Sequence, residues 1–185
     1  YYYEDIKKLI PSNDVTINNQ LNNDGAVNPE HILDRYRVQP VSVLYRLDVH
    51  KDILESDKFL YKSKYFLMGD TQLWFGFAKK GKIHFIPKVM CVYRRNRGSV
   101  SNQKSMKSLF RFELSSNEMR YYISQNYDLS QDYNSRILKN YSDSLLKYKL
   151  LDRHFEPLFK IKQKHTFLKK IYFSCYLLMF FVGKN

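Results

Sequence analysis

The sequence predicts an α/β chain in which short strands and helices alternate before a helical hairpin. Apolar residues recur at helical spacing after position 70, and again over about 103–125 and 131–151. With 185 residues and 44% hydrophobic content, the chain is large enough to bury the core of a globular domain. Three segments rich in β-branched and apolar residues are typical of strands: 40–46, 83–86 and 89–93.

The first part of the chain is expected to contain a loop, a short helix, a strand and a second helix. Residues 12–29 are rich in Asn, Asp and Gly, which favour turns because their side chains bond the local backbone or tolerate left-handed conformations. A proline at the first turn then suits a short helix over 29–36. After the strand candidate at 40–46, Asp48 is placed to cap a helix over 48–55.

A helix–strand–strand unit is expected next. The apolar spacing after Asp70 predicts a helix over 71–80, and Gly81 stands where a C-cap glycine belongs. The two strand candidates that follow are separated by Pro87, which a ladder tolerates only at a strand end or edge.

Two longer helices and a basic, apolar tail complete the chain. The linker 126–130 carries helix stop and start signals, so we expect a helical hairpin. Segment 171–182 is nearly continuous in apolar residues but shorter than the roughly 20 residues that span a bilayer as a helix. It is either an interfacial helix held by charge to anionic lipid or a core helix.

The formal net charge of +13 predicts an anionic partner: nucleic acid, a phosphorylated donor or an acidic membrane surface. The segment from Lys147 to Lys170 contains eight basic and two acidic residues, so much of the excess positive charge lies there. Cys91 and Cys175 have no neighbouring Cys or His at ligand spacing, which argues against a zinc site or a disulfide framework. A reducing, cytosolic setting fits this cysteine usage.

Asp70 is the candidate catalytic residue. A carboxylate that lies just before an amphipathic helix can take the proton of an attacking hydroxyl group. The same position equally suits a helix N-cap, whose oxygens accept backbone N–H bonds. From spacing alone, the capping role is the stronger interpretation.

An ordered set of motifs around Asp70 resembles the C-terminal half of family 2 glycosyltransferases, inverting enzymes of the GT-A fold. The resemblance covers about residues 1–101. It implies a partial GT-A mixed sheet with flanking helices over 1–101. The helical hairpin over 102–152 and the basic, apolar tail over 153–185 are expected from the sequence pattern alone. In chain order the matching motifs are PVSVLYR at 40–46, Gly69-Asp70, Leu73-Trp74, Gly81-Lys82-Ile83, Phe85-Ile86-Pro87, Val89, Tyr93-Arg94 and Gly98-Ser99-Val100-Ser101.

The resemblance also implies roles for individual residues. Asp70 would be the catalytic base, and Trp74 would lie close to the acceptor pocket or pack beneath it. The helical spacing of Trp74 with its apolar neighbours favours a place in the core. The basic loop that contains Arg94, Arg95 and Arg97 would face the donor diphosphate, because guanidinium groups pair well with phosphate oxygens. A solvated basic loop is the equal alternative.

Family 2 enzymes hold a divalent metal, Mg or Mn, on the donor diphosphate through an Asp-x-Asp motif in an N-terminal half. No such motif follows a strand in this sequence, and Asn96 stands where many relatives carry a His that helps to hold the metal or diphosphate. We therefore expect the metal ligands to lie mostly outside residues 1–185, and these residues alone to be inactive.

The partners implied by the resemblance are a nucleotide-sugar donor and a glycan or lipid-linked acceptor, in cell-surface polysaccharide synthesis at the inner face of the membrane. Two other classes stay open. A nucleic-acid-binding module would use the basic charge and the interleaved Tyr and Phe, but the sequence contains no recognition motif. A non-catalytic remnant or membrane scaffold is expected if no donor half exists.

Overall fold

The chain divides into two compact units, Tyr1–Gln103 and Lys104–Asn185, which are described separately below. The computed structural model describes residues 2–3, 8–9, 27–34, 40–84, 86, 94–95, 105–161, 171 and 173–175.

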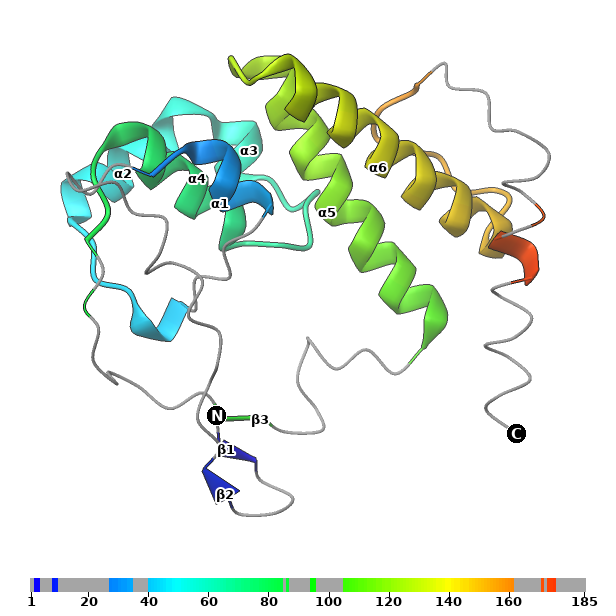
Figure 1. The fold of residues 1–185 in the computed structure, drawn as a ribbon, viewed down its shortest axis with the longest axis horizontal. Helices are drawn as coiled ribbons and strands as arrows, with labels where there is room; N and C mark the ends of the chain where they lie inside the picture. Colours follow the sequence, from blue (N-terminus) through cyan, green and yellow to red (C-terminus); the bar gives the residue numbers. More distant parts are fainter. Residues whose placement is uncertain are drawn as a thin grey trace. The chain divides into compact units, whose positions relative to one another are not determined.

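Helix α4 (Thr71–Lys80) is the central element of the first unit. It contacts α1 (Pro29–Asp34), α2 (Leu47–Ser56) and α3 (Lys58–Lys62), and the four helices gather in one cluster in Figure 1. A short 3-10 helix, η1 (Pro40–Ser42), precedes α2. The apolar side chains buried in this unit are Val27, Ile32, Leu33, Ile53, Leu60, Phe66, Trp74, Phe75 and Ala78.

Gly76 allows α4 to pack closely against α2 and α3. A Cβ atom at this position would lie 2.7 Å from Ile53 Cγ2 and 2.9 Å from the Tyr61 hydroxyl oxygen. Real Cβ atoms do not approach other atoms so closely, so a larger residue would force the helices apart.

Three strands of two residues each form a small sheet in the same unit. They are β1 (Tyr2–Tyr3), β2 (Lys8–Leu9) and β3 (Arg94–Arg95), and their order in the sheet is β2-β1-β3. β1 pairs antiparallel with β2 and parallel with β3, so the backbones at Tyr2 and Arg94 lie opposite each other.

The expected α/β fold, with a GT-A mixed sheet flanked by helices, is wrong. The residues that the structure describes are mainly helical, and their strands are limited to the three short segments above. A GT-A sheet needs long strands that bury their side chains between helices. Here the buried side chains of the first unit come mostly from helices that pack on one another.

The strand expected over 40–46 is replaced by η1 and an irregular segment. Val43 N donates to Pro40 O at 3.4 Å, which closes a turn where the strand was predicted to begin. Leu44 is 93% exposed, and none of the described strands pairs with this segment. The β-branched composition therefore had no neighbouring strand to pack on. Likewise, the described residues 83, 84 and 86 are irregular where a strand was predicted.

The helices of the first unit follow the sequence pattern more closely. The helix predicted over 71–80 is confirmed as α4, and Gly81 ends it by donating its N–H to Phe77 O at 3.0 Å. The helix predicted over 48–55 is confirmed as α2, but Asp48 does not cap it. Asp48 instead pairs with Arg46, through a contact of 2.6 Å from Arg46 NH2 to Asp48 Oδ2.

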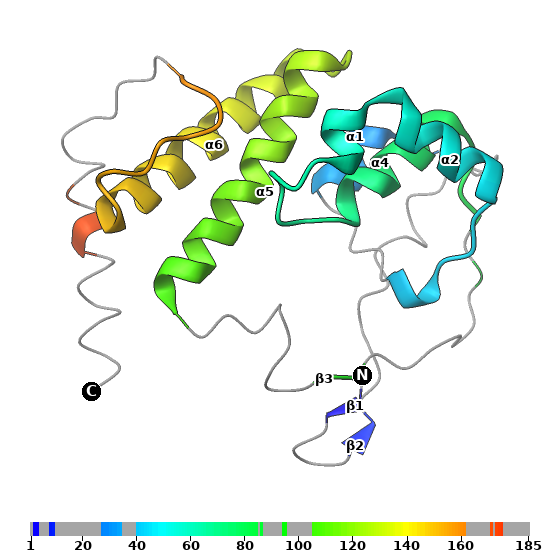
Figure 2. The same cartoon turned by 180° about the vertical axis from the view of Figure 1, so that it is seen from behind.

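The second unit is built on an antiparallel hairpin of α5 (Met106–Asn126) and α6 (Gln131–Leu151). The two helices lie side by side in both views (Figures 1 and 2). This arrangement confirms both predicted helices and their linker. The buried cluster between them consists of Met106, Phe110, Leu114, Tyr141, Leu145 and Tyr148.

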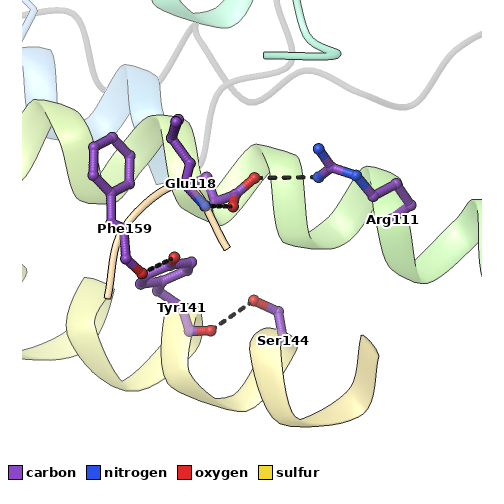
Figure 3. Close-up of polar contacts among 6 residues, drawn as sticks. Arg111, Glu118, Tyr141, Ser144 and Phe159 are labelled. Atoms are coloured by element: carbon purple, nitrogen blue, oxygen red, sulfur yellow. Dashed lines mark hydrogen bonds and ion pairs between the residues drawn. The ribbon is translucent and has the colours of Figure 1, made fainter. Parts of the chain in front are cut away.

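The segment after α6 folds back onto the hairpin (Figure 3). Tyr141 OH donates to Phe159 O at 2.6 Å, and Leu158 N donates to Glu118 Oε1 at 3.2 Å. Glu118 is buried, and Arg111 NH1 donates to its other oxygen at 3.1 Å. Burial raises the pKa of the Tyr141 phenol, and the nearby Glu118 carboxylate adds to the shift.

Most of the predicted loop at 12–29, the strand at 89–93 and most of the apolar segment at 171–182 lie outside the described residues. Within the described part of that last segment, Phe173 is buried and lies against Lys147, whose Nζ is 5.4 Å from the ring centroid. None of the helices that the structure describes is long and apolar enough to cross a membrane.

Candidate functional site around Asp70

Asp70 lies immediately before α4, as the sequence predicted. Its Oδ1 accepts a hydrogen bond from Thr71 N at 2.8 Å and a longer one from Thr71 Oγ1 at 3.4 Å. The side chain is half-buried, and its other oxygen, Oδ2, accepts no hydrogen bond in the part of the chain that the structure describes.

Three other helices show how an ordinary cap differs from Asp70. Asp57 accepts from Leu60 N, Ser105 from Ser108 N and Ser130 from Tyr133 N, each three residues further along the chain. Their backbones are extended, which is the usual geometry for an N-cap.

Asp70 has a different geometry from these three caps. Its backbone is already helical, with φ −99° and ψ −44°, and among the described residues its carboxylate accepts hydrogen bonds only from Thr71. It leaves the amides two and three residues onward without the carboxylate partner that an N-cap supplies. The capping interpretation, which spacing alone favoured, therefore accounts for one oxygen of this carboxylate and not for the other.

Asp70, Trp74 and Phe77 share one face of α4, because residues four and seven positions apart lie above one another on a helix. Trp74 is only 6% exposed, so its ring is a core side chain and does not present a face to solvent. Its indole Nε1 is buried and has no hydrogen-bond partner among the described residues. Trp74 therefore packs beneath this face.

Tyr45 covers the aromatic part of this face. Its ring centroid lies 6.4 Å from that of Trp74, 4.9 Å from that of Phe77 and 5.0 Å from that of His50. Tyr45 nevertheless stays 46% exposed. It is the most exposed ring of this cluster, since His50 and Phe77 are half-buried and Trp74 is buried.

Gln72 fixes the chain just before α4. Its Nε2 donates to Met68 O at 2.5 Å, so the loop that leads to Asp70 is tied to the first turn of the helix. Gln72 Oε1 is buried and has no partner among the described residues. Reversing the amide would place its oxygen against the Met68 carbonyl, so the hydrogen bond sets its orientation.

The predicted diphosphate-binding arginines are only partly described. The backbones of Arg94 and Arg95 form β3 beside β1, in register with Tyr2 and Tyr3. Arg97 and Asn96 lie outside the described residues. The backbones of two of the three arginines therefore lie in the sheet of the first unit.

A metal site is not formed by the part of the chain that the structure describes. No group of three or more His, Cys, Asp or Glu side chains gathers there. The metal implied by the resemblance, with ligands expected mostly outside residues 1–185, stays a prediction.

A shallow pocket of about 280 Å³ lies in the second unit, and none of the candidate site residues around Asp70 lines it. Lys147 Nζ pairs with Glu113 Oε1 at 2.7 Å on its wall. Its lining residues are Glu113, Asn117, Asn140, Asp143, Lys147 and Phe173.

Two residues of interest escaped the sequence analysis. Tyr45 was assigned to a strand, and only the polar residues close to it, such as Asp48 and His50, could have indicated an exposed turn. Glu118 falls on the same helical stripe as Phe110 and Leu114, so an acid on an apolar face was the available signal.

No protein-family model, curated protein or solved structure matches this chain.

Proposed function

We propose that this chain supplies the acceptor side of an inverting glycosyltransferase, with Asp70 as the catalytic base. The proposal joins the motif order around Asp70, which resembles family 2 glycosyltransferases, to the local geometry of this carboxylate. It does not depend on the α/β sheet that the sequence wrongly predicted. For the role of Asp70 it requires an accessible carboxylate on a fixed helix.

The observation that carries the proposal is the uncommitted Oδ2 of Asp70. The carboxylate is held by Thr71 through Oδ1, while Oδ2 accepts no hydrogen bond from the described residues. A general base must be positioned and yet keep an oxygen for the proton it receives. Asp57 in the same unit differs in the amide that it bonds, since its Oδ1 accepts from Leu60 N, three residues onward.

The proposed reaction is a single displacement. The acceptor hydroxyl oxygen forms a bond to the anomeric carbon of the donor sugar, and the bond from that carbon to the diphosphate oxygen breaks. The electron pair of the broken bond leaves with the nucleoside diphosphate, and the hydroxyl proton passes to Asp70 Oδ2. Because the attack comes from the face opposite the leaving group, the anomeric configuration inverts.

The donor is assigned by charge. The departing diphosphate is an anion, and the formal net charge of +13 favours its approach. Arg94, Arg95 and Arg97 are the proposed contacts to its oxygens, because guanidinium groups can donate two hydrogen bonds to a phosphate. The acceptor is a glycan or a lipid-linked sugar, in the assembly of a cell-surface polysaccharide.

The reaction class can be tested with the full-length protein. It should be incubated with UDP-glucose, UDP-galactose, UDP-N-acetylglucosamine or GDP-mannose, together with methyl glycosides as acceptors. We expect acceptor-dependent release of the nucleoside diphosphate with at least one donor, and a product whose anomeric configuration is inverted by NMR. A retained configuration, or no release with any pair, would contradict the proposal.

A further inference from the structure

Tyr45 combines exposure with a fixed position. Its ring packs against His50, Trp74 and Phe77, yet 46% of the residue stays accessible. An aromatic ring held by other rings loses little conformational freedom when a ligand binds to it. Tyr45 is therefore a preformed flat surface.

This surface lies over the helix face that begins at Asp70. Tyr45 packs on Trp74 and Phe77, and Asp70 lies one turn before Trp74 on the same face. The closer of the two α4 contacts of Tyr45 is Phe77, which lies seven residues, or about 10 Å along the axis, from Asp70. A ligand on Tyr45 that extends toward the start of α4 therefore approaches the carboxylate.

Polar side chains follow Tyr45 in the chain at Arg46 and Asp48. Arg46 and Asp48 form a two-point ion pair, with Nε–Oδ1 at 3.3 Å and NH2–Oδ2 at 2.6 Å. Their side chains are 79% and 62% exposed, so both keep donors and acceptors that face water. Hydrogen bonding to Arg46 lowers the pKa of Asp48, which keeps this acceptor charged.

A flat aromatic ring beside paired donors and acceptors is complementary to a pyranose sugar, which has an apolar C–H face and a rim of hydroxyl groups. An alkyl chain would make no use of the ion pair. We infer that Tyr45 is the stacking surface for the acceptor, and that the acceptor presents a ring-form sugar to Asp70. This inference rests on the proposed function and specifies its acceptor class.

The test measures sugar binding directly, without any transfer. Methyl glycosides of glucose, galactose and N-acetylglucosamine serve as probes in saturation-transfer NMR with the full-length protein, and glycerol serves as the non-ring control. We expect saturation of the ring C–H protons of at least one glycoside and none of glycerol. Tyr45→Ala should weaken that binding by about 3- to 10-fold, the loss expected for one aromatic contact, whereas Tyr45→Phe should retain it.

Leu44→Ser is the matched control, because Leu44 is 93% exposed next to Tyr45 and contributes no ring. A lipid-binding surface would lose affinity through Leu44→Ser, whereas a sugar-stacking surface would not. The inference is overturned if the unaltered protein binds no glycoside, if Tyr45→Ala leaves the affinity unchanged, or if Leu44→Ser weakens it equally. Retained circular dichroism of Tyr45→Ala shows that it still folds.

Failure of this inference can be told apart from failure of the proposed function. Asp70→Asn removes the proposed base but keeps the ring of Tyr45, so saturation transfer to the glycosides should persist while sugar transfer is lost. If glycosides bind through Tyr45 but Asp70→Asn transfers sugar normally, the role of Asp70 as base is wrong and the stacking surface stands. If Asp70→Asn abolishes transfer but Tyr45→Ala binds glycosides normally, the stacking role of Tyr45 is wrong and the role of Asp70 as base stands.

Discussion

Leu158 N donates to Glu118 Oε1 at 3.2 Å, which joins two residues 40 positions apart in the sequence. Arg111 NH1 donates to the other carboxylate oxygen at 3.1 Å, so this buried acid has a partner on each oxygen (Figure 3). The contact fixes the segment that follows α6 onto α5. It makes Glu118 a structural residue of the second unit.

Glu118→Ala should lower the free energy of unfolding of the second unit by about 1–3 kcal/mol, because it leaves a backbone N–H and a guanidinium without their acceptor. Urea unfolding followed by circular dichroism measures the loss. Glu113→Ala is the control, since it breaks the more exposed pair with Lys147 and should cost less than about 1 kcal/mol. Equal losses in the two variants would contradict the role of Glu118.

The raised pKa of Tyr141 predicts that the second unit loses stability at alkaline pH. Burial raises the pKa of its phenol above the value of about 10 in the unfolded chain. The unfolded state therefore loses this proton first as the pH rises. The stability contributed by the buried neutral phenol is complete below about pH 10 and declines at higher pH.

Tyr141→Phe should reduce this decline, measured as the change in urea midpoint between pH 8 and pH 11. At neutral pH it should cost about 1 kcal/mol, because the hydrogen bond to Phe159 O is lost. Tyr65→Phe is the control, since Tyr65 is 58% exposed and its ring contact with Phe59 survives the change. An unchanged alkaline slope in Tyr141→Phe would contradict the interpretation.

Gly76→Ala should destabilise the first unit, although alanine is the better helix former by about 1 kcal/mol. The added Cβ would meet Ile53 Cγ2 at 2.7 Å, and such overpacking typically costs about 1–3 kcal/mol. Thermal unfolding compares it with Gly81→Ala, where an added Cβ meets nothing within 4 Å. A gain in stability from Gly76→Ala would show that α4 can move away from α2.

Local patterns predicted the helices well because caps and apolar spacing act within a few residues. The bounds of α6 follow from Ser130 before the helix and from apolar residues at helical spacing. The predicted sheet failed for the opposite reason, since a strand is stabilised only by partners elsewhere in the chain. The segment that contains Leu44 and Tyr45 has strand composition without such a partner among the described residues.

For the candidate site, too, the sequence predicted the local element but not the contacts between distant segments. The sequence placed Asp70 at the start of α4, because a glycine and an acid before an apolar stripe are local signals. It could not show which atoms the carboxylate contacts, and it could not show that Tyr45 covers Trp74 and Phe77. Those contacts depend on how separate segments pack.

The role of Asp70 as base is tested most directly by the turnover number of Asp70→Asn in sugar transfer, measured beside Asp57→Asn. Asparagine keeps an oxygen that can bond Thr71 N or Leu60 N, so both variants should fold. We expect Asp70→Asn to lower turnover by about two to four orders of magnitude, as for the loss of a general base, and Asp57→Asn to stay near normal. Near-normal turnover in Asp70→Asn, or an equal loss in both variants, would contradict the account.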